Sequence, residues 1–256
     1  MTLPRIGVIV SHYQRPDGLR RALRSIREQT IAGELDVVVC DDASRSDLFP
    51  WDDVADWHRV HVLRGPRYSP RAKASQVLTM SSLINQATQI VAAPLIAYLT
   101  DDAEWAPDHL ERLRYTICDY GRGAVAVGSR VRTLSYAFEG QEGPKVSEQP
   151  AHPDGPMRTQ EFRSMLDASK VFDHSAVLHW RRYLHRDWPV EPTYWSCPDW
   201  EAWRRMCRHA RDAGETHWLF DQAIDVTVHD CPGDIGRSLT YGDSRMQIFE
   251  RLEKGP

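Results

Sequence analysis

Short apolar runs alternate with longer segments of helical periodicity through the first 120 residues of this 256-residue chain. The runs lie at residues 6–10, 37–40, 60–63 and 95–99. Between them, apolar residues recur at the spacing of one buried helix face, as Leu19, Leu23 and Ile26 do. Strands that alternate with helices are typical of an α/β domain, whose helical crossovers join the strands of a mixed, mainly parallel sheet.

The pattern is less regular after residue 120. We expect strands at residues 124–131, 171–178 and 226–229, and a helix at residues 199–213. Glycine and proline are frequent between residues 139 and 157, which predicts a long mobile loop there. Since the sequence shows no internal repeat, we expect a single compact domain whose second half completes a cleft.

The charge balance argues against a protein built to bind nucleic acid. Lysine and arginine number 32 and aspartate and glutamate 36, which gives a net charge of −4, whereas nucleic-acid-binding domains are usually basic. The five cysteines form no C-x-x-C pair, which favours a reducing compartment. The longest nearly apolar stretch, residues 90–99, falls well short of the ~20 residues that span a bilayer. With no visible signal peptide, we expect a cytoplasmic protein without a membrane span.

Several frequent catalytic motifs are absent from the sequence. It contains no G-x-x-x-x-G-K-[ST] phosphate loop, no dinucleotide-binding glycine pattern, no G-x-S-x-G elbow and no H-E-x-x-H helix. These absences disfavour NAD enzymes, triad hydrolases and zinc proteases.

Two pairs of adjacent aspartates follow predicted strands. Asp41 and Asp42 come after the second strand, and Asp101 and Asp102 come after the fourth. Because ligands bind at the carboxyl ends of strands in open α/β sheets, both pairs face the expected crevice. Aspartates at such positions also form turns and helix N-caps, but adjacent carboxylates repel one another unless a cation or hydrogen-bond donors compensate. Mg²⁺ and Mn²⁺ prefer oxygen ligands and are the natural partners.

A series of short motifs occurs in a characteristic order and spacing. The motifs are residues 8–13 (VIVSHY), Ser25-Ile26, Gln29-Thr30, residues 41–44 (DDAS), residues 83–87 (LINQA), residues 100–102 (TDD), Pro107-Asp108, Asp173-His174 and Pro198-Asp199. Together they resemble the family 2 inverting glycosyltransferases of the GT-A fold, most closely the spore-coat polysaccharide biosynthesis type. The resemblance covers roughly residues 5–232. It implies a nucleotide-sugar-binding half at residues 1–120 and an acceptor-binding half at residues 121–256 of the same domain.

The resemblance implies a donor site for a UDP- or dTDP-sugar. Asp42 would accept a hydrogen bond from the imide N–H group of the base. Tyr13 would stack on that base, and Ser11 would lie beside it. Asp101 would approach the ribose or the donor sugar.

The resemblance also implies a divalent cation, Mn²⁺ or Mg²⁺, that bridges the donor diphosphate. The family signature is D-x-D, but Ala103 occupies the third position here, which leaves Asp102 as the dependable metal carboxylate. His229 is a candidate second ligand, and a structural role for it stays open. Lys73, with Arg71 as the alternative, is a candidate basic donor-site residue, although either one also suits a solvated loop.

By the same resemblance, Asp199 is the general base that takes the proton from the acceptor hydroxyl group. An N-cap role for Asp199 is the alternative, and the two are compatible because capping favours the charged form. Glu201 is the second candidate for the base. Candidates for acceptor contacts are Asp173, His174, Trp195 and Glu201, with a hydrogen-bonded structural pair as the alternative for the first two.

These features imply a metal-dependent inverting glycosyltransferase that moves a sugar from a nucleotide-diphosphate donor to a hydroxyl-bearing acceptor by single displacement. The acceptor would be a glycan, a lipid-linked sugar or a small metabolite, and a homo-oligomer is compatible with the sequence. Two alternatives stay open: a catalytically inactive nucleotide-sugar-binding protein and a metal-dependent nucleotidyltransferase. The latter usually needs a glycine-rich basic loop near the N-terminus, where residues 11–18 contain only Arg15 and Gly18 of that kind.

Overall fold

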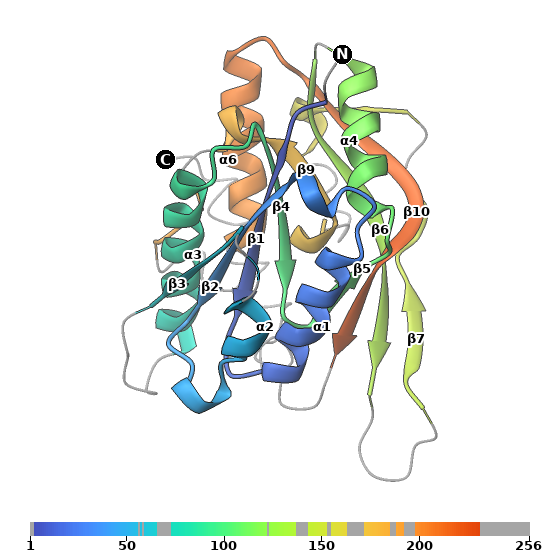
Figure 1. The fold of residues 1–256 in the computed structure, drawn as a ribbon. Helices are drawn as coiled ribbons and strands as arrows, with labels where there is room; N and C mark the ends of the chain where they lie inside the picture. Colours follow the sequence, from blue (N-terminus) through green and yellow to red (C-terminus); the bar gives the residue numbers. More distant parts are fainter. Residues whose placement is uncertain are drawn as a thin grey trace.

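A ten-stranded sheet forms the centre of the molecule, with the strand order β3-β2-β1-β4-β9-β6-β10-β5, β7 beside β6 and β8 beside β10 (Figure 1). The computed structural model describes residues 3–55, 57, 59–65, 73–121, 123–136, 143–152, 155–162, 172–184, 188–191 and 198–230, with no side chains for Leu48 and residues 73–78. The first four strands in this order pair in parallel, as predicted. β9 pairs antiparallel with both β4 and β6, which makes the sheet mixed.

The strands are β1 (Ile6–His12), β2 (Leu35–Asp41), β3 (Val60–Arg64), β4 (Leu95–Thr100), β5 (Ala103–Trp105), β6 (Ala124–Ser135), β7 (Lys145–Glu148), β8 (Met157–Arg158), β9 (Val177–Trp180) and β10 (His217–Asp230). The helices are α1 (Pro16–Arg27), α2 (Trp51–Ala55), α3 (Lys73–Ile90), α4 (His109–Tyr120) and α6 (Pro198–Asp212). A 3₁₀ turn at His174–Ala176 leads into β9. Within the described residues, no helix is both long enough and apolar enough to span a bilayer.

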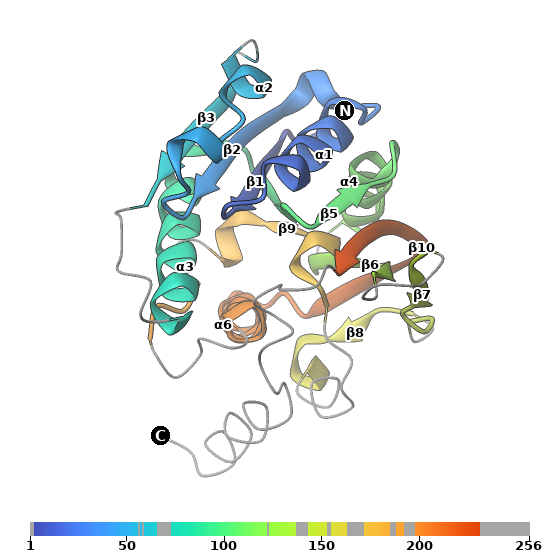
Figure 2. The same ribbon diagram turned by 90° about the horizontal axis from the view of Figure 1, so that it is seen from below.

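Helices cover both faces of the sheet, and each face has its own hydrophobic core (Figure 2). α1 and α4 pack on one face, and α3 and α6 on the other. The alternation of side chains along β1 explains this division, because Val8 and Val10 belong to the α1 core and Ile9 to the α3 core. A Cβ atom at Gly7 would lie 1.9 Å from Val91 Cγ1, so only glycine lets the chain after α3 pack this closely.

The second half of the chain departs from the sequence prediction in three places. β9 begins at Val177 rather than at residue 171, because Asp173 caps a 3₁₀ turn before it. β10 has 14 residues and extends well beyond the predicted segment 226–229. β7 lies inside the segment predicted as a loop, and its four residues are all exposed, so no apolar alternation marks it. The mobility of residues 139–157 stays a prediction, and residues 139–142, 153 and 154 of that segment lie outside the described part of the chain.

Candidate functional site

The loops after β1 and β2 meet at the carboxyl edge of the sheet. The Gln14 N–H group donates to Ser44 Oγ at 2.8 Å, and the Asp42 N–H group donates to the His12 carbonyl oxygen at 2.9 Å. Gln14 and Ala43 have φ angles of 52° and 56°, left-handed values that are strained for a non-glycine residue and often occur at functional loops. The two loops therefore form one closely connected unit at this edge.

Asp101 holds the loop after β1 in place. Its Oδ2 atom accepts the Tyr13 N–H group and contacts His12 Nδ1, both at 2.9 Å, and its Oδ1 atom accepts Arg15 Nη1 at 3.2 Å. The side chain is only 8% exposed. Because both oxygens already have protein partners, Asp101 fixes the backbone of Tyr13, and its expected contact with the donor sugar stays a prediction.

Asp102 is the more open member of the pair, with 28% of its side chain exposed. Its Oδ1 atom accepts the Thr100 hydroxyl group, and its Oδ2 atom lies 3.3 Å from Arg15 Nη1. A Cβ atom at Gly18 would lie 2.1 Å from the Asp101 carbonyl oxygen, so glycine lets the first turn of α1 approach the end of β4. The approach of α1 brings Arg15 to the acidic pair.

Asp41 and Asp42 have opposite environments. Asp41 is fully buried and accepts Arg64 Nε at 2.7 Å and the Ser44 N–H group at 3.1 Å. Asp42 is 6% exposed, and none of the described residues donates a hydrogen bond to its carboxyl group. Burial, together with the charge of Asp41, raises the pKa of Asp42 to about 7. A buried carboxyl group of this kind suits a ligand that supplies its own N–H group.

Asp173, His174 and Asp199 form the second part of the site. His174 Nδ1 lies 3.9 Å from Asp199 Oδ2, and the two side chains are 22% and 20% exposed. Asp173 Oδ1 accepts the Ser175 N–H group at 2.8 Å, which caps the 3₁₀ turn. Asp199 Oδ1 accepts the Trp200 N–H group at 3.0 Å. Asp199 is the second residue of α6 rather than its N-cap, and it combines a bond to the next backbone N–H group through one oxygen with a second oxygen directed at His174.

Electrostatic interactions connect this trio with Asp102. Burial lowers the pKa of His174, but Asp199, Asp173 and Asp102 raise it, and the net result is a raised pKa. Burial raises the pKa of Asp173, and the charges of Asp102 and Asp199 add to this rise. Together with the 3.9 Å contact between His174 and Asp199, these interactions define one cluster of Asp102, Asp173, His174 and Asp199.

Two hydroxyl groups link Asp102 to the 3₁₀ turn. Thr100 Oγ1 lies 3.2 Å from the buried Ser175 Oγ and also donates to Asp102. A hydroxyl group carries one proton, so Thr100 donates its single hydrogen bond to the carboxylate and accepts a hydrogen bond from Ser175. This fixed order of donors connects the end of β4 to the residues before β9.

His229 lies next to Asp102, but both of its ring nitrogens have protein partners. The backbone N–H group of His229 donates to the Asp102 carbonyl oxygen at 2.6 Å. Nδ1 lies 2.9 Å from the Tyr136 hydroxyl group, and Nε2 lies 3.0 Å from Glu104 Oε1. Among the residues that the structure describes, no three His, Cys, Asp or Glu side chains gather to hold a metal ion. A metal ion at Asp102 would therefore need ligands from a bound substrate or water.

Glu201 does not face the cluster. Its buried carboxylate pairs with arginines of its own helix, Arg204, Arg205 and Arg208. Two steps along a helix turn the side-chain direction by ~200°, so Asp199 and Glu201 project from different sides of α6. This placement does not support our expectation of Glu201 as a base or acceptor residue. Trp195 and Arg71, and the side chain of Lys73, lie outside the described residues.

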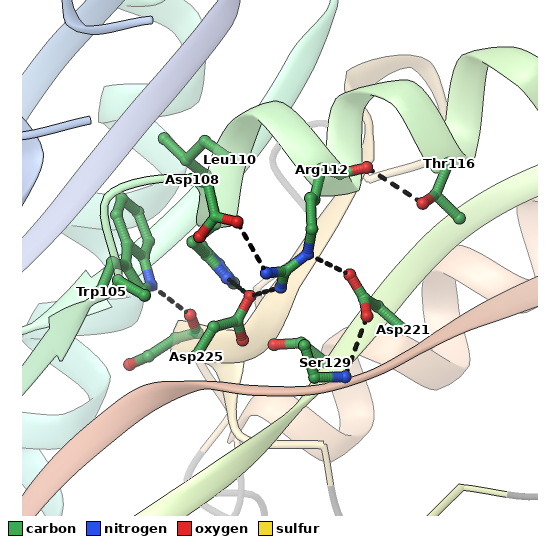
Figure 3. Close-up of polar contacts among 12 residues, drawn as sticks. Trp105, Asp108, Leu110, Arg112, Thr116, Ser129, Asp221 and Asp225 are labelled. Carbon is green, nitrogen blue, oxygen red and sulfur yellow. Dashed lines mark hydrogen bonds and ion pairs between the residues drawn. The ribbon is translucent and has the colours of Figure 1, made fainter. Parts of the chain in front are cut away.

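A polar network lies behind the site, between α4 and β10 (Figure 3). Arg112 of α4 pairs with Asp225 of β10, and its Nε atom lies 2.9 Å from Asp221 Oδ2. β5 pairs with β10 beside this network, and Trp105 of β5 donates its indole N–H group to the Ser175 carbonyl oxygen at 2.6 Å. The Trp105 bond ties the 3₁₀ turn of the site to β5, and β5 in turn pairs with β10.

Sequence reasoning assigned no role in the site to Arg15, Thr100 or Ser175. Two of them stand directly beside predicted residues, since Thr100 precedes Asp101 and Ser175 follows His174. Arg15 stood out only as the basic residue of the first loop. Position at the carboxyl ends of β1 and β4 is the signal that points to Arg15 and Thr100.

The family described as glycosyl transferase family 2 matches residues 7–177, which is more than half of the chain. The chain belongs to glycosyl transferase family 2. The matched range contains both aspartate pairs and the Asp173-His174 motif. Asp199 and His229 lie beyond it, so their roles depend on the site geometry.

One curated relative and two solved structures are similar to this chain. Protein CgeD of Bacillus subtilis (strain 168) is 24% identical over 216 residues, which are 79% of this chain and 46% of CgeD. The structure of S. aureus TarS 1–349 in complex with UDP-GlcNAc has a TM-score of 0.62 at 12% identity and covers 92% of this chain and 61% of its own. The mannosyltransferase PcManGT from Pyrobaculum calidifontis, in complex with GDP-Man and Mn²⁺, has a TM-score of 0.55 at 18% identity and covers 98% and 63%. This family 2 chain therefore has the predicted GT-A fold and spans about half the length of its curated relative.

Proposed function

We propose that the protein is a metal-dependent inverting glycosyltransferase that moves a sugar from a UDP- or dTDP-sugar to an acceptor hydroxyl group by single displacement. The observation that carries the proposal is the arrangement of three carboxyl groups. Asp42 is buried without a donor among the described residues, Asp102 is open, and Asp199 interacts through His174 with the same cluster as Asp102. The nucleotide sugars named with TarS and PcManGT support a donor of this class.

The environment of Asp42 supports recognition of uracil or thymine. An ionised Asp42 accepts the imide N–H group of these bases, whereas cytosine has an unprotonated ring nitrogen at that place. A site with a buried polar group discriminates strongly against a ligand that leaves this group unpaired. Tyr13 is the candidate for stacking on the base, and its N–H group is held by Asp101.

The residues present fit a divalent cation. Mg²⁺ in proteins is commonly held by one or two carboxylates together with substrate phosphates, and Asp102 supplies an accessible carboxylate at 28% exposure. His229 is the candidate second ligand, provided that its Nε2 atom leaves Glu104. When bound, the cation would stabilise negative charge on the departing diphosphate as a Lewis acid.

Asp199 is the proposed general base. It would take the proton from the acceptor hydroxyl group while that oxygen attacks the anomeric carbon from the face opposite the diphosphate, which inverts the configuration. Its place in the first turn of α6 and the Trp200 N–H group are both features that attract a carboxylate. His174, whose pKa is raised, lies 3.9 Å away. An ionised carboxylate is the state that a base needs before the reaction.

The acceptor is proposed by class only. Asp173 and His174 offer polar groups beside Asp199, which suits a hydroxyl-bearing glycan, lipid-linked sugar or small metabolite. The neighbouring Trp188 is 2% exposed and packs edge-on against His174 at 5.7 Å between ring centroids. Trp188 therefore belongs to the hydrophobic core beside His174 and does not offer a face for a sugar ring.

A thermal-shift screen of UDP-, dTDP- and GDP-sugars with and without Mn²⁺ tests the proposal. We expect a UDP- or dTDP-sugar to raise the melting temperature only when Mn²⁺ is present, and we expect Asp102→Ala to lose this response. Asp47→Ala is the matched control, because Asp47 is exposed and pairs with Arg45. Equal stabilisation of wild type and Asp102→Ala, or no stabilisation by any donor, would contradict the proposal.

A second measurement separates an enzyme from an inactive binding protein. We expect slow release of the nucleoside diphosphate from the stabilising donor, as water replaces the acceptor. Analysis of the sugar product by NMR should show an inverted anomeric configuration. Donor binding with no release over days would favour the inactive alternative, and retention of configuration would refute single displacement.

A further inference from the structure

Arg15 pairs with both members of the acidic pair at the end of β4. Its Nη1 atom lies 3.2 Å from Asp101 Oδ1 and 3.3 Å from Asp102 Oδ2, and its side chain is 32% exposed. Its carbonyl oxygen accepts the Leu19 N–H group at 2.9 Å, which fixes its backbone at the start of α1. The guanidinium group therefore extends from a fixed position onto the carboxylate oxygen that is otherwise open to a ligand.

We propose that Arg15 is the resident counter-ion of this acidic pair and keeps the affinity for a free divalent cation low until a nucleoside diphosphate is bound. A cation at Asp102 Oδ2 would lie a few ångströms from the guanidinium group, and like charges at that distance repel. The diphosphate supplies negative charge that balances both cations. Cation and donor therefore bind cooperatively, because the bound diphosphate raises the affinity for the cation. This inference rests on the proposed donor and metal site and adds this coupling between the two ligands.

Among the described residues, Arg15 is the arginine or lysine that contacts the Asp102 carboxylate directly, whereas Asp173 and His174 interact with Asp102 electrostatically. The neutral Thr100 hydroxyl group donates a hydrogen bond to Asp102 Oδ1, and the backbone N–H group of His229 donates to the Asp102 carbonyl oxygen. With Arg15 in place, two carboxylates and one guanidinium give a local charge of −1; without it the local charge is −2. A unit charge this close to a partly exposed site changes the affinity for a divalent ion by about tenfold or more.

Electron paramagnetic resonance of free Mn²⁺ measures the effect without reference to activity. Wild type, Arg15→Gln, Arg15→Lys and Arg20→Gln are titrated with Mn²⁺ in the absence and presence of UDP. Arg20 is the matched control, because it belongs to the same helix and pairs with Asp17 and Asp53 at 2.9 and 3.0 Å. Without UDP, Arg15→Gln should bind Mn²⁺ about tenfold more tightly than wild type, whereas Arg15→Lys and Arg20→Gln should match wild type. With UDP present, the advantage of Arg15→Gln should shrink to about threefold or less.

Equal or weaker Mn²⁺ binding by Arg15→Gln than by wild type without UDP overturns the inference, and so does an advantage that UDP leaves unchanged. Arg15→Met keeps the length of the side chain and replaces Arg15→Gln if the latter melts early. Failure of this inference is distinguishable from failure of the proposed function, because sugar transfer that needs Asp102 and Asp199 would stand even if Arg15 left Mn²⁺ affinity unaltered. Conversely, tighter Mn²⁺ binding by Arg15→Gln would stand if no sugar were transferred.

Discussion

The raised pKa of Asp42 predicts that donor binding strengthens as the pH rises through neutrality. Burial and the charge of Asp41 raise this pKa to about 7, so at pH 7 about half of the free protein carries a neutral Asp42. The imide N–H group of the base donates to the ionised carboxyl group, so the proton has to leave before this hydrogen bond forms. The apparent affinity should therefore be about twofold below its high-pH value at pH 7 and about tenfold below it at pH 6.

Isothermal titration calorimetry with UDP-glucose in excess Mg²⁺ measures this dependence from about pH 5.5 to 8.5. UDP-glucose is the suitable probe because both of its phosphates are esterified and do not titrate in this range. Asp42→Asn should bind more weakly and lose the pH dependence, whereas Asp47→Asn, at an exposed site, should keep it. An affinity that is constant over the range, or the same slope in Asp42→Asn, would refute the assignment of Asp42 to the base.

The same carboxyl group links stability to pH with the opposite sign. A carboxyl group whose pKa is higher in the folded than in the unfolded protein favours folding while it is protonated, and this contribution is lost as the pH rises from about 4 to 7. Asp42→Asn removes the charge from the buried site, so its melting temperature should exceed that of wild type at pH 8 and approach it near pH 4. A lower melting temperature of Asp42→Asn at pH 8 would show that the protein itself stabilises the ionised carboxyl group.

Substitutions at three further positions, two of them with a matched control, test other parts of the site. Asp199→Asn should lower the turnover number by about 10²–10⁴-fold with donor affinity unchanged. Glu201→Gln should instead lower the melting temperature and leave the turnover number within about threefold of wild type. A normal turnover number in Asp199→Asn would exclude Asp199 as the base. Gly18→Ala should weaken Mn²⁺-dependent donor binding and lower the melting temperature, because its Cβ atom would lie 2.1 Å from the Asp101 carbonyl oxygen. Gly33→Ala is the control, because a Cβ atom there meets no atom within 4 Å. Equal effects in both variants would refute this packing argument. Thr100→Val removes the hydroxyl link to the acidic pair and should raise the donor KM more than it lowers kcat, and unchanged kinetics would exclude a positioning role.

The parallel half of the fold follows from the sequence because its strands are buried on both faces. Residues 6–10 and 95–99 are continuous apolar runs, as expected for parallel strands between two helical layers. The rule that parallel strands present their carboxyl ends at one edge then brings the two aspartate pairs together. The helix with Trp200 and Trp203 on one stripe was predicted from its apolar periodicity, and both tryptophans lie in the core.

The sequence does not reveal features that depend on exposed strands or loop geometry. All four residues of β7 are exposed, and β5 is only three residues long, so neither strand shows an apolar periodicity in the sequence. The different roles of Asp101 and Asp102 depend on the path of the loop after β1, including the left-handed Gln14. The pairing of Arg15 with both aspartates depends on the same loop and on the close approach of α1.

A crystal structure with UDP-glucose and Mn²⁺ tests the central claim most directly. The account predicts the uracil imide nitrogen within hydrogen-bond distance of Asp42, the Mn²⁺ ion on Asp102, and the anomeric carbon facing Asp199 across a space large enough for an acceptor hydroxyl group. A nucleotide bound away from Asp42, or an Asp199 carboxylate on the same side of the anomeric carbon as the diphosphate, would contradict it.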